Sequence, residues 1–331
     1  MINSTETTMG LVTLEDIRAA AARIRPTARV TPLVEAPWPG SQPAGADRPL
    51  WLKCENLQPM GAFKIRGAIN MLAHLSADQL ARGVITYSSG NHGQAVALAA
   101  RERGARAVIV MPTTAPAIKV DGARGYGADV LFAGTTSTDR KVRAEQEAEA
   151  RGLTIVPPFD HPWIIAGQGT SGLEILGQAP DVATVFVPMG GGGLISGVAA
   201  ALKLSKPEVR VVGVEPEGAP KMTRSREAGH PVTLEWSASI ADGLLTMRPG
   251  DLTFKHVQAF VDTIVTVTDE QIARAVAWLS RHARLVVEPS GAATVAAVAA
   301  GLSDPSLDGP CVAIVSGGNV EPSAFAKYLL G

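Results

Sequence analysis

The chain is long and nearly neutral, which excludes several classes of protein. It has 331 residues, of which 46% are hydrophobic and 18% charged, with 34 glycines and a formal charge of −1. A chain of this length predicts two lobes or one large α/β unit, with room for a ligand between lobes. The balance of charge argues against non-specific binding of nucleic acid or of an anionic membrane. We therefore expect small-molecule partners.

Targeting segments and common metal patterns are not recognisable in the sequence. No run reaches the ~18 apolar residues of a membrane-spanning helix. The start, MINSTETTMG, lacks the basic and apolar regions of a signal peptide, so we expect a cytoplasmic protein. The two cysteines, Cys54 and Cys311, predict small buried thiols and not a disulfide. The six histidines have no short spacing to one another or to cysteine, which argues against a zinc site.

The predicted elements alternate between helix and strand along the chain. The first is a helix that Thr13 can cap, with Asp16 at its third position, and that Pro26 ends. Short apolar runs predict strands at 50–53, 84–87, 107–111, 129–132, 184–187, 209–214, 263–267 and 311–315. Helices are predicted at 64–75, 92–103, 116–126, 138–151, 170–178, 194–205, 269–284 and 290–301. Strands that are apolar throughout predict an α/β fold with parallel sheets covered by helices on both faces, in three α/β/α layers.

Three glycine-rich turns follow predicted strands: SSGNHG at 88–93, GGGG at 190–193 and SGGN at 316–319. In parallel sheets ligands bind beyond the carboxyl ends of the strands, so all three turns belong to the functional edge. The four glycines lead directly into the helix that opens at Leu194, and their unhindered N–H groups suit a phosphate. The SSGNHG turn suits a carboxylate, although ordinary helix capping by serine and asparagine explains it equally well when it is taken alone.

Lys64, in GAFKIRGA, is predicted near the start of a helix, where the helix dipole disfavours a cation. It would tolerate this position best as a neutral amine, or as a Schiff base to a cofactor that adds negative charge. By itself a single lysine is most often a surface charge. Its neighbours therefore decide its interpretation.

These segments resemble the fold type II pyridoxal 5′-phosphate (PLP) enzymes, in the branch of serine/threonine dehydratases and serine racemases. The segment KCENLQPMGAFKIRGA (53–68) resembles the lysine motif of that family. Further matches are SSGNHGQA (88–95), PPFDHPWIIAGQGT (157–170), PMGGGGLISG (188–197), GVEPEG (213–218), IADG (240–243), VVEPSG (286–291) and SGGNV (316–320). They occur in family order over about residues 13–325.

The resemblance implies a two-lobed, tryptophan synthase β-like fold. The large PLP-binding domain would combine 1–80 with 160–331, and the small domain, 81–159, would bind the substrate carboxylate. The chain stops twelve residues after Asn319, so we expect no C-terminal regulatory domain. A homodimer is also implied.

For the cofactor, the resemblance implies that Lys64 carries PLP as a Schiff base and, once released, acts as the base at the substrate Cα. Phe63 would flank the ring, Asn91 would bind the ring oxygen and Ser316 the pyridine nitrogen. The phosphate would be held by Gly190, Gly191, Gly192, Gly193 and the Leu194 amide. A serine hydroxyl does not force protonation of that nitrogen, which favours loss of a β-substituent over transamination.

For the substrate, the resemblance implies that Ser88, Ser89, Asn91 and His92 bind the carboxylate. In racemases the serine matching Ser89 also exchanges a proton at Cα, whereas many dehydratases have alanine there, so racemisation stays open. Arg140 matches an arginine that reaches the substrate in racemase-like and hydroxyaspartate-dehydrating relatives. It is either a solvated helix charge or a bidentate partner for a second substrate carboxylate.

Two positions depart from the family pattern. Ala62 replaces a serine found in many relatives and removes one hydroxyl beside the ring. Racemase-like relatives bind Ca²⁺ or Mg²⁺ through a glutamate matching Glu215, a carbonyl near Ala219 and an acid where this chain has Lys221. An ammonium cannot ligate a metal. We therefore predict that this metal site is absent or weakened and that Lys221 pairs with Glu215.

The resemblance implies a PLP-dependent ammonia-lyase acting on a small amino-acid substrate. Elimination from L-threonine or L-serine, giving a 2-oxo acid and ammonia, ranks first; dehydration of threo-3-hydroxyaspartate and serine racemisation follow. A non-catalytic PLP-binding or effector-sensing protein is a rival that the joint presence of Lys64, Asn91 and Ser316 disfavours.

A nicotinamide-dependent oxidoreductase is the more distant alternative, since a strand, glycines, a helix and a strand ending near Glu215 resemble a dinucleotide unit. However, Gly191, Gly193 and Ser196 do not form a clean G-x-G-x-x-G pattern.

Overall fold

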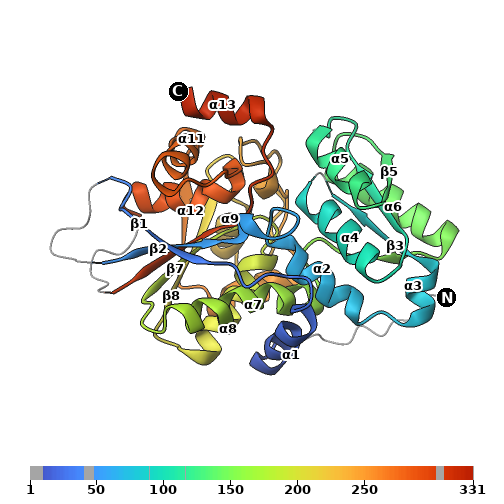
Figure 1. Ribbon diagram of the computed structural model, residues 1–331, viewed down its shortest axis with the longest axis horizontal. Helices are drawn as coiled ribbons and strands as arrows, with labels where there is room; N and C mark the ends of the chain where they lie inside the picture. Colours follow the sequence, from blue (N-terminus) through green and yellow to red (C-terminus); the bar gives the residue numbers. More distant parts are fainter. Residues whose placement is uncertain (1–9, 41–47, 89, 116, 303–308, 331) are drawn as a thin grey trace.

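The computed structural model describes residues 10–40, 48–88, 90–115, 117–302 and 309–330. Within these ranges the strands form one six-stranded sheet, of order β1-β2-β10-β7-β8-β9, and one four-stranded sheet, of order β5-β4-β3-β6. The strands are β1 (Leu33–Ala36), β2 (Leu50–Cys54), β3 (Val84–Tyr87), β4 (Ala107–Met111), β5 (Asp129–Phe132), β6 (Thr154–Ile155), β7 (Thr184–Pro188), β8 (Arg210–Pro216), β9 (Thr263–Val267) and β10 (Cys311–Val315). Figure 1 shows the two sheets in separate halves of the molecule.

Helices cover both faces of each sheet. They are α1 (Leu14–Ile24), α2 (Lys64–Ala73), α3 (Ala77–Arg82), α4 (Asn91–Glu102), α5 (Ala117–Gly125), α6 (Ser137–Arg151), α7 (Pro162–Gln178), α8 (Gly193–Ser205), α9 (Lys221–Ala228), α10 (Asp251–Phe260), α11 (Asp269–Trp278), α12 (Pro289–Ala299) and α13 (Pro322–Leu330). Short 3₁₀ turns, η1 (Glu55–Leu57) and η2 (Asp242–Leu244), and a π-helical turn, η3 (Leu279–Ala283), complete the set.

Alternate residues of a strand belong to different hydrophobic clusters, which is the physical basis of the layers. In β4, Ile109 and Met111 pack with α4, whereas Val108 and Val110 pack with Ala144 of α6. In the larger sheet α12 lies on one face and α8 on the other (Figure 1). The predicted three-layer α/β architecture is thus confirmed.

The prediction of wholly parallel sheets was wrong on one point. The six-stranded sheet is mixed, because β1 pairs antiparallel with β2, whereas the other strand pairs are parallel. Neither β1 nor the two-residue β6 was predicted. β1 is a short edge strand with an exposed Glu35, and so it lacks the continuous apolar character by which the central strands were recognised.

The start of α1 agrees with the sequence-based prediction. Thr13 and Asp16 form the expected capping box at α1. α7, however, begins at Pro162 and not at 170, because the His161 side chain accepts the Trp163 N–H at 3.2 Å and proline suits the first helical position. The helices α3, α9, α10 and α13 were not predicted.

The N-terminus of α10 is capped from a distant part of the chain. The Asp160 carboxylate accepts the backbone N–H groups of Asp251, Leu252 and Thr253, each at 3.0 Å. Three of the four N–H groups that every helix leaves unpaired at its start are satisfied in this way. The cap lies about ninety residues before the helix in the sequence, so no local pattern announces it.

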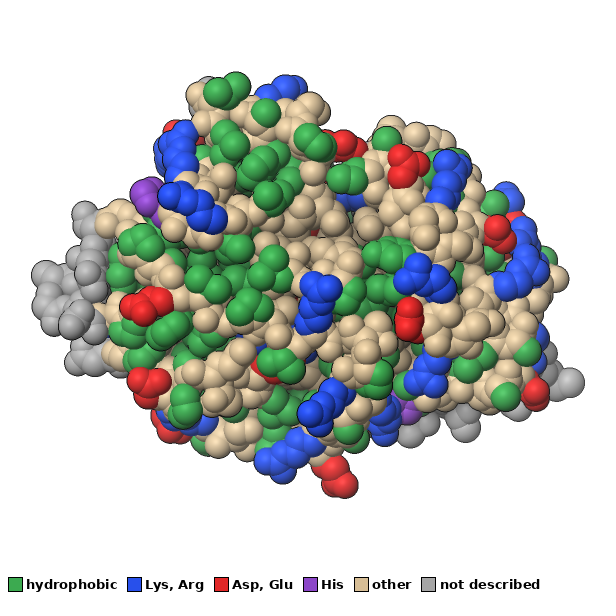
Figure 2. Space-filling view, viewed as in Figure 1, with side chains coloured by type: hydrophobic (Ala, Val, Ile, Leu, Met, Phe, Trp, Pro, Cys, Tyr) green, Lys and Arg blue, Asp and Glu red, His purple; other side chains and the backbone are tan. Residues whose placement is uncertain are grey.

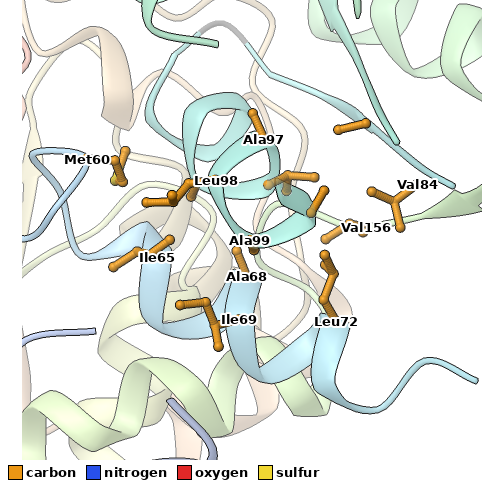
Figure 3. Packing of buried hydrophobic residues seen from close by; sticks show 14 of the residues in the cluster. Met60, Ile65, Ala68, Ile69, Leu72, Val84, Ala97, Leu98, Ala99 and Val156 are labelled. Carbon is orange, nitrogen blue, oxygen red and sulfur yellow. The ribbon is translucent and has the colours of Figure 1, made fainter. Parts of the chain in front are cut away.

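α2 lies between the two halves of the molecule and packs against α4 and α7. Figure 3 shows Ala68 of α2 beside Ala99 of α4, and Ile65 and Leu72 of α2 belong to the same buried cluster. On its other side α2 approaches α7 closely enough to require glycine. A Cβ on Gly67 would lie 2.9 Å from the Ile164 carbonyl, and one on Gly167 would lie 2.6 Å from the Gly67 Cα. This close packing fixes the helix that begins with Lys64.

Three buried charges and one partly exposed carboxylate, that of Glu174, anchor the same helix. Arg66 binds Glu55 (Nε–Oε2, 2.7 Å) and Glu174 (Nη1–Oε1, 2.6 Å), and Lys53 binds Glu174 (Nζ–Oε2, 2.6 Å). The two cations and two anions balance. Burial lowers the pKa of Lys53, while Arg66 holds the pKa of Glu55 below its usual value. Buried charges are tolerated only when they are paired in this way.

Acidic and basic side chains are interspersed on the face seen in Figure 2, as the near-neutral composition predicts. Cys54 and Cys311 are buried free thiols, so the prediction of no disulfide between them is confirmed. In the described part of the chain, no helix combines the length and apolar character needed to cross a membrane.

Candidate active site

Two of the three glycine-rich turns meet directly beside the start of α2. Asn319, in the turn after β10, donates from Nδ2 to Asn91 Oδ1 at 2.9 Å, and Asn91 opens α4. The same turn accepts the N–H of Phe63 through the Ser316 carbonyl at 3.1 Å. The turns that follow β10 of the larger sheet and β3 of the smaller sheet therefore meet near the start of α2.

The third turn, 190–193, reaches this place through η2. A Cβ on Gly190 would lie 3.0 Å from the Gly243 carbonyl. Gly243 in turn donates its N–H to Ser290 Oγ at 2.8 Å, and the Ser290 carbonyl is 3.5 Å from Ser316 Oγ. All three turns thus border one region.

Lys64 begins α2 and is half-buried. Its Nζ donates to the Pro158 carbonyl at 2.8 Å and lies 5.2 Å from the centre of the Phe63 ring. Burial lowers the pKa of Lys64 to about 8. The described residues supply no carboxylate partner within ion-pair distance of this ammonium. An amine in this setting loses its proton more readily than a solvated lysine and can serve as a nucleophile or base.

The 190–193 turn is shaped to bind an anion. Gly192, with φ of +98°, is the N-cap of α8, and no side chain caps the helix. A Cβ on Gly191 would lie 2.4 Å from the Phe159 ring, so a larger residue does not fit. Thr253 Oγ1 donates to the Gly191 carbonyl at 2.7 Å and orients the turn. Uncapped N–H groups at the start of a thirteen-residue helix suit a phosphate.

Comparison with known proteins identifies the family. Residues 24–317 match the family model described as pyridoxal-phosphate dependent enzyme. The chain belongs to this family. The resemblance drawn from the sequence motifs is therefore confirmed, PLP is the cofactor, and the dinucleotide interpretation of the 184–215 region is not supported.

Individual relatives agree with this assignment. The chain is 44% identical to the L-threonine ammonia-lyase of Thermotoga maritima over 320 residues, which are 96% of this chain and 78% of that protein. It is 42% identical to the biosynthetic L-threonine dehydratase of Pasteurella multocida over 82% of this chain, but spans only 53% of that protein. Its structure is similar to that of maize serine racemase, with a TM-score of 0.89, 38% identity and coverage of 97% of this chain and 98% of the other.

The residues present at the site fit PLP. Lys64 supplies an amine with a lowered pKa, and the 190–193 turn supplies uncapped N–H groups for a phosphate. Ser316 is 4% exposed, and the only hydrogen bond of its hydroxyl to the described residues is the long contact to the Ser290 carbonyl, so the hydroxyl is available to a ring nitrogen. These are the chemical groups that an aldehyde, a phosphate and a pyridine require.

The predicted substrate-binding residues differ in their burial and in their hydrogen-bond partners. Ser88 Oγ accepts the Gly90 N–H at 3.1 Å, which shapes the turn, and Ser89 lies outside the described residues. His92 is buried against the Val156 carbonyl at 3.2 Å, and burial lowers its pKa to about 3. A neutral His92 thus supports the turn from beneath, and any contact with substrate stays a prediction.

Arg140 lies in the first turn of α6 and is partly exposed. Its Nη1 donates to the Thr135 carbonyl at 3.3 Å, within the same helix start. Its described contacts do not join it to Lys64 or to the glycine-rich turns. The choice between a solvated charge and a substrate ligand therefore stays open.

Glu288 and its neighbours are the site residues that the sequence did not reveal. Glu288 Oε1 accepts from Asn91 Nδ2 at 2.5 Å, and its Oε2 lies 4.0 Å from Lys119 Nζ, which also pairs with Asp242. Burial raises the pKa of Glu288 to about 7. The VVEPSG and IADG segments contain Glu288 and Asp242 and so were the available signal. Only the fold brings them to Lys119 of α5.

Lys221 forms the ion pair with Glu215 that the sequence predicted, with Nζ 3.0 Å from Oε1. Both side chains are fully buried. Within the described residues, no group of three or more histidine, cysteine, aspartate or glutamate side chains could hold a metal ion.

Proposed function

We propose that this protein is an ammonia-lyase that converts L-threonine or L-serine into a 2-oxo acid and ammonia. The observation that carries the proposal is Lys64, a half-buried lysine of lowered pKa that lies near three glycine-rich turns and has no carboxylate partner among the residues that the structure describes. The sequence similarity to an L-threonine ammonia-lyase supports the choice of reaction. The reaction balances in two steps: the substrate first loses its β-hydroxyl as water, and one water is then consumed when hydrolysis releases the amino group as ammonia.

In this proposal each group of residues has one task. The 190–194 backbone binds the cofactor phosphate, and Asn91 and Ser316 orient the ring. Ser88, Ser89 and the Asn91 amide bind the substrate carboxylate, with His92 beneath them. Lys64 removes the proton from Cα, a role that suits an amine whose pKa is about 8. PLP, when bound, supplies the sink for the electrons left at Cα.

Chemical reduction tests the position of the cofactor. Borohydride treatment of the yellow holoenzyme is expected to leave a pyridoxyl group on Lys64, located by peptide mass spectrometry. Lys64→Ala is expected to abolish that adduct and to lower turnover by about 10²–10⁴-fold. Lys141, an exposed lysine of α6, provides the matched control Lys141→Ala. An adduct on another side chain would reject the assignment.

A substrate panel tests the reaction. Release of 2-oxo acid from L-threonine, L-serine, D-serine and threo-3-hydroxyaspartate is measured with and without a chelator. The proposal expects the two L-hydroxy amino acids to be the best substrates. Reaction of a D-substrate alone would refute this ranking while leaving the cofactor assignment intact.

Serine racemisation is the second candidate, and the structural similarity to maize serine racemase favours it. Chiral analysis of L-serine incubations measures it, and Ser89→Ala is expected to remove racemisation while retaining elimination. For threo-3-hydroxyaspartate, Arg140→Met is expected to raise KM only if Arg140 binds the second carboxylate.

We also propose that 81–159 forms the small domain and that 1–80 with 160–331 forms the large one. The division of the strands between the two sheets supports this. We further propose a cytoplasmic homodimer. Light scattering of the purified holoenzyme tests the oligomeric state, and fractionation of the source cells tests the location.

A further inference from the structure

The ammonium of Lys221 is enclosed by oxygen atoms. Lys221 is the first residue of α9, and its side chain is wholly buried. Its Nζ lies 3.0 Å from each of four oxygens: the carbonyls of Met189, Ala219 and Leu244, and Oε1 of Glu215. A fully buried lysine with four protein oxygens around its ammonium is an unusual arrangement that needs an explanation.

The number of hydrogens argues that this amine is charged. An ammonium offers three N–H donors to the four oxygens, whereas a neutral amine offers two and turns a lone pair toward an acceptor. Burial lowers the pKa of Lys221, but the Glu215 carboxylate raises it. Glu215 itself accepts the N–H of Met222 and both the N–H and hydroxyl of Thr223. These three donors and the Lys221 ammonium surround the carboxylate, and the opposite charges of Lys221 and Glu215 offset each other.

The carbonyls that the ammonium binds belong to the edge of the cofactor site. Met189 directly precedes Gly190, the first residue of the 190–193 turn, and Leu244 ends η2, which contacts that turn through Gly243. One cation therefore holds together the end of β7 and the η2 segment. Without the ammonium, the carbonyl oxygens of Met189 and Leu244 would lose this hydrogen-bond donor, and a buried acceptor without a donor destabilises the fold.

We propose that Lys221 is an internal cation that fixes the 190–193 turn, and that truncating its side chain leaves a site for a small monovalent cation such as ammonium. The inference uses the proposal that this turn holds the cofactor phosphate. The N···O distances of 3.0 Å are longer than the 2.0–2.1 Å of Mg²⁺ or the 2.3–2.6 Å of Ca²⁺. The oxygens are therefore spaced for an ammonium-sized ion. Lys221 is a positioning residue, because it acts on the cofactor through the backbone of the turn.

Titration of the apoenzyme with PLP tests the proposal, with Lys221→Ala as the variant and tetramethylammonium chloride as the background salt. The variant is expected to bind PLP about tenfold or more weakly than wild type, as when an orienting contact is lost at other built sites. Ammonium chloride at equal ionic strength is expected to restore the affinity with saturation. The wild-type affinity should not respond to ammonium. The ³¹P resonance of the bound cofactor should broaden in the variant and sharpen again with ammonium.

Three outcomes would overturn the proposal. They are a variant that binds PLP as tightly as wild type without ammonium, a restoration by Mg²⁺ but not by ammonium, and a wild type that loses PLP on chelation. Because the readout is cofactor affinity, the result is independent of which amino acid is deaminated. A protein that binds PLP normally but lacks lyase activity would refute the proposed function alone.

A double variant covers the case in which Lys221→Ala does not fold. Glu215→Gln with Lys221→Met removes both charges and leaves no unpaired buried ion. It is expected to fold, to bind PLP more weakly than wild type and to ignore ammonium, since the methionine fills the space. Wild-type affinity in this variant would show that the ammonium does not shape the turn.

Discussion

Replacement of Arg66 by methionine tests whether buried ion pairs hold the helix that carries Lys64. The guanidinium binds Glu55 and Glu174 at 2.6–2.8 Å, and the Arg66 and Glu55 side chains have no exposed surface. Methionine keeps much of the volume but leaves the Glu55 and Glu174 carboxylates with Lys53 as the one nearby cation among the described residues. Loss of one partner of a buried pair costs about 3–5 kcal/mol. We therefore expect Arg66→Met to lower the free energy of unfolding by about this amount.

The assay is urea unfolding of the holoenzyme, followed by circular dichroism and by the cofactor absorbance. Arg274→Met is the matched control, since Arg274 also pairs with a glutamate, Glu270, but both side chains are exposed (64% and 77%). An exposed pair contributes about 0–1 kcal/mol. A loss of less than about 1 kcal/mol for Arg66→Met, or equal losses in both variants, would refute the argument.

Three further predictions concern other parts of the molecule. Burial raises the pKa of Glu288 from 4.5 to about 7, so the folded protein holds this proton more tightly than the unfolded chain does. The wild type should therefore lose stability relative to Glu288→Gln as the pH rises through this interval. A difference in melting temperature between the two proteins that stays constant over this pH range would contradict the prediction. Gly191→Ala should weaken PLP binding because its Cβ meets the Phe159 ring at 2.4 Å, whereas Gly177→Ala, with no atom within 4 Å, should leave binding unchanged in the same titration. Thr13→Ala should lower the unfolding free energy by about 1 kcal/mol in urea, since it removes the capping box of α1; no change would mean that the box contributes nothing.

Short stretches of the sequence are sufficient to predict one helix cap, the central strands and the family of this protein. The α1 capping box needs only Thr13 and Asp16, three residues apart. Apolar β-branched runs were sufficient to place the central strands, because a doubly covered sheet buries every residue along them. The glycine-rich turns and Lys64 were recognisable as a family pattern, and the match to the PLP-dependent family confirms that recognition. Each of these features depends on residues that lie close together in the sequence.

The tertiary structure alone decided features that depend on distant partners. α10 begins where the Asp160 carboxylate meets it, so its start has no signal in the neighbouring sequence. Lys119, Asp242 and Glu288 meet only because the two sheets face each other. The raised pKa of Glu288 and the lowered pKa of Lys64 both arise from burial. A residue's chemical groups are given by its identity, but its charge state depends on how much water the rest of the chain excludes around it.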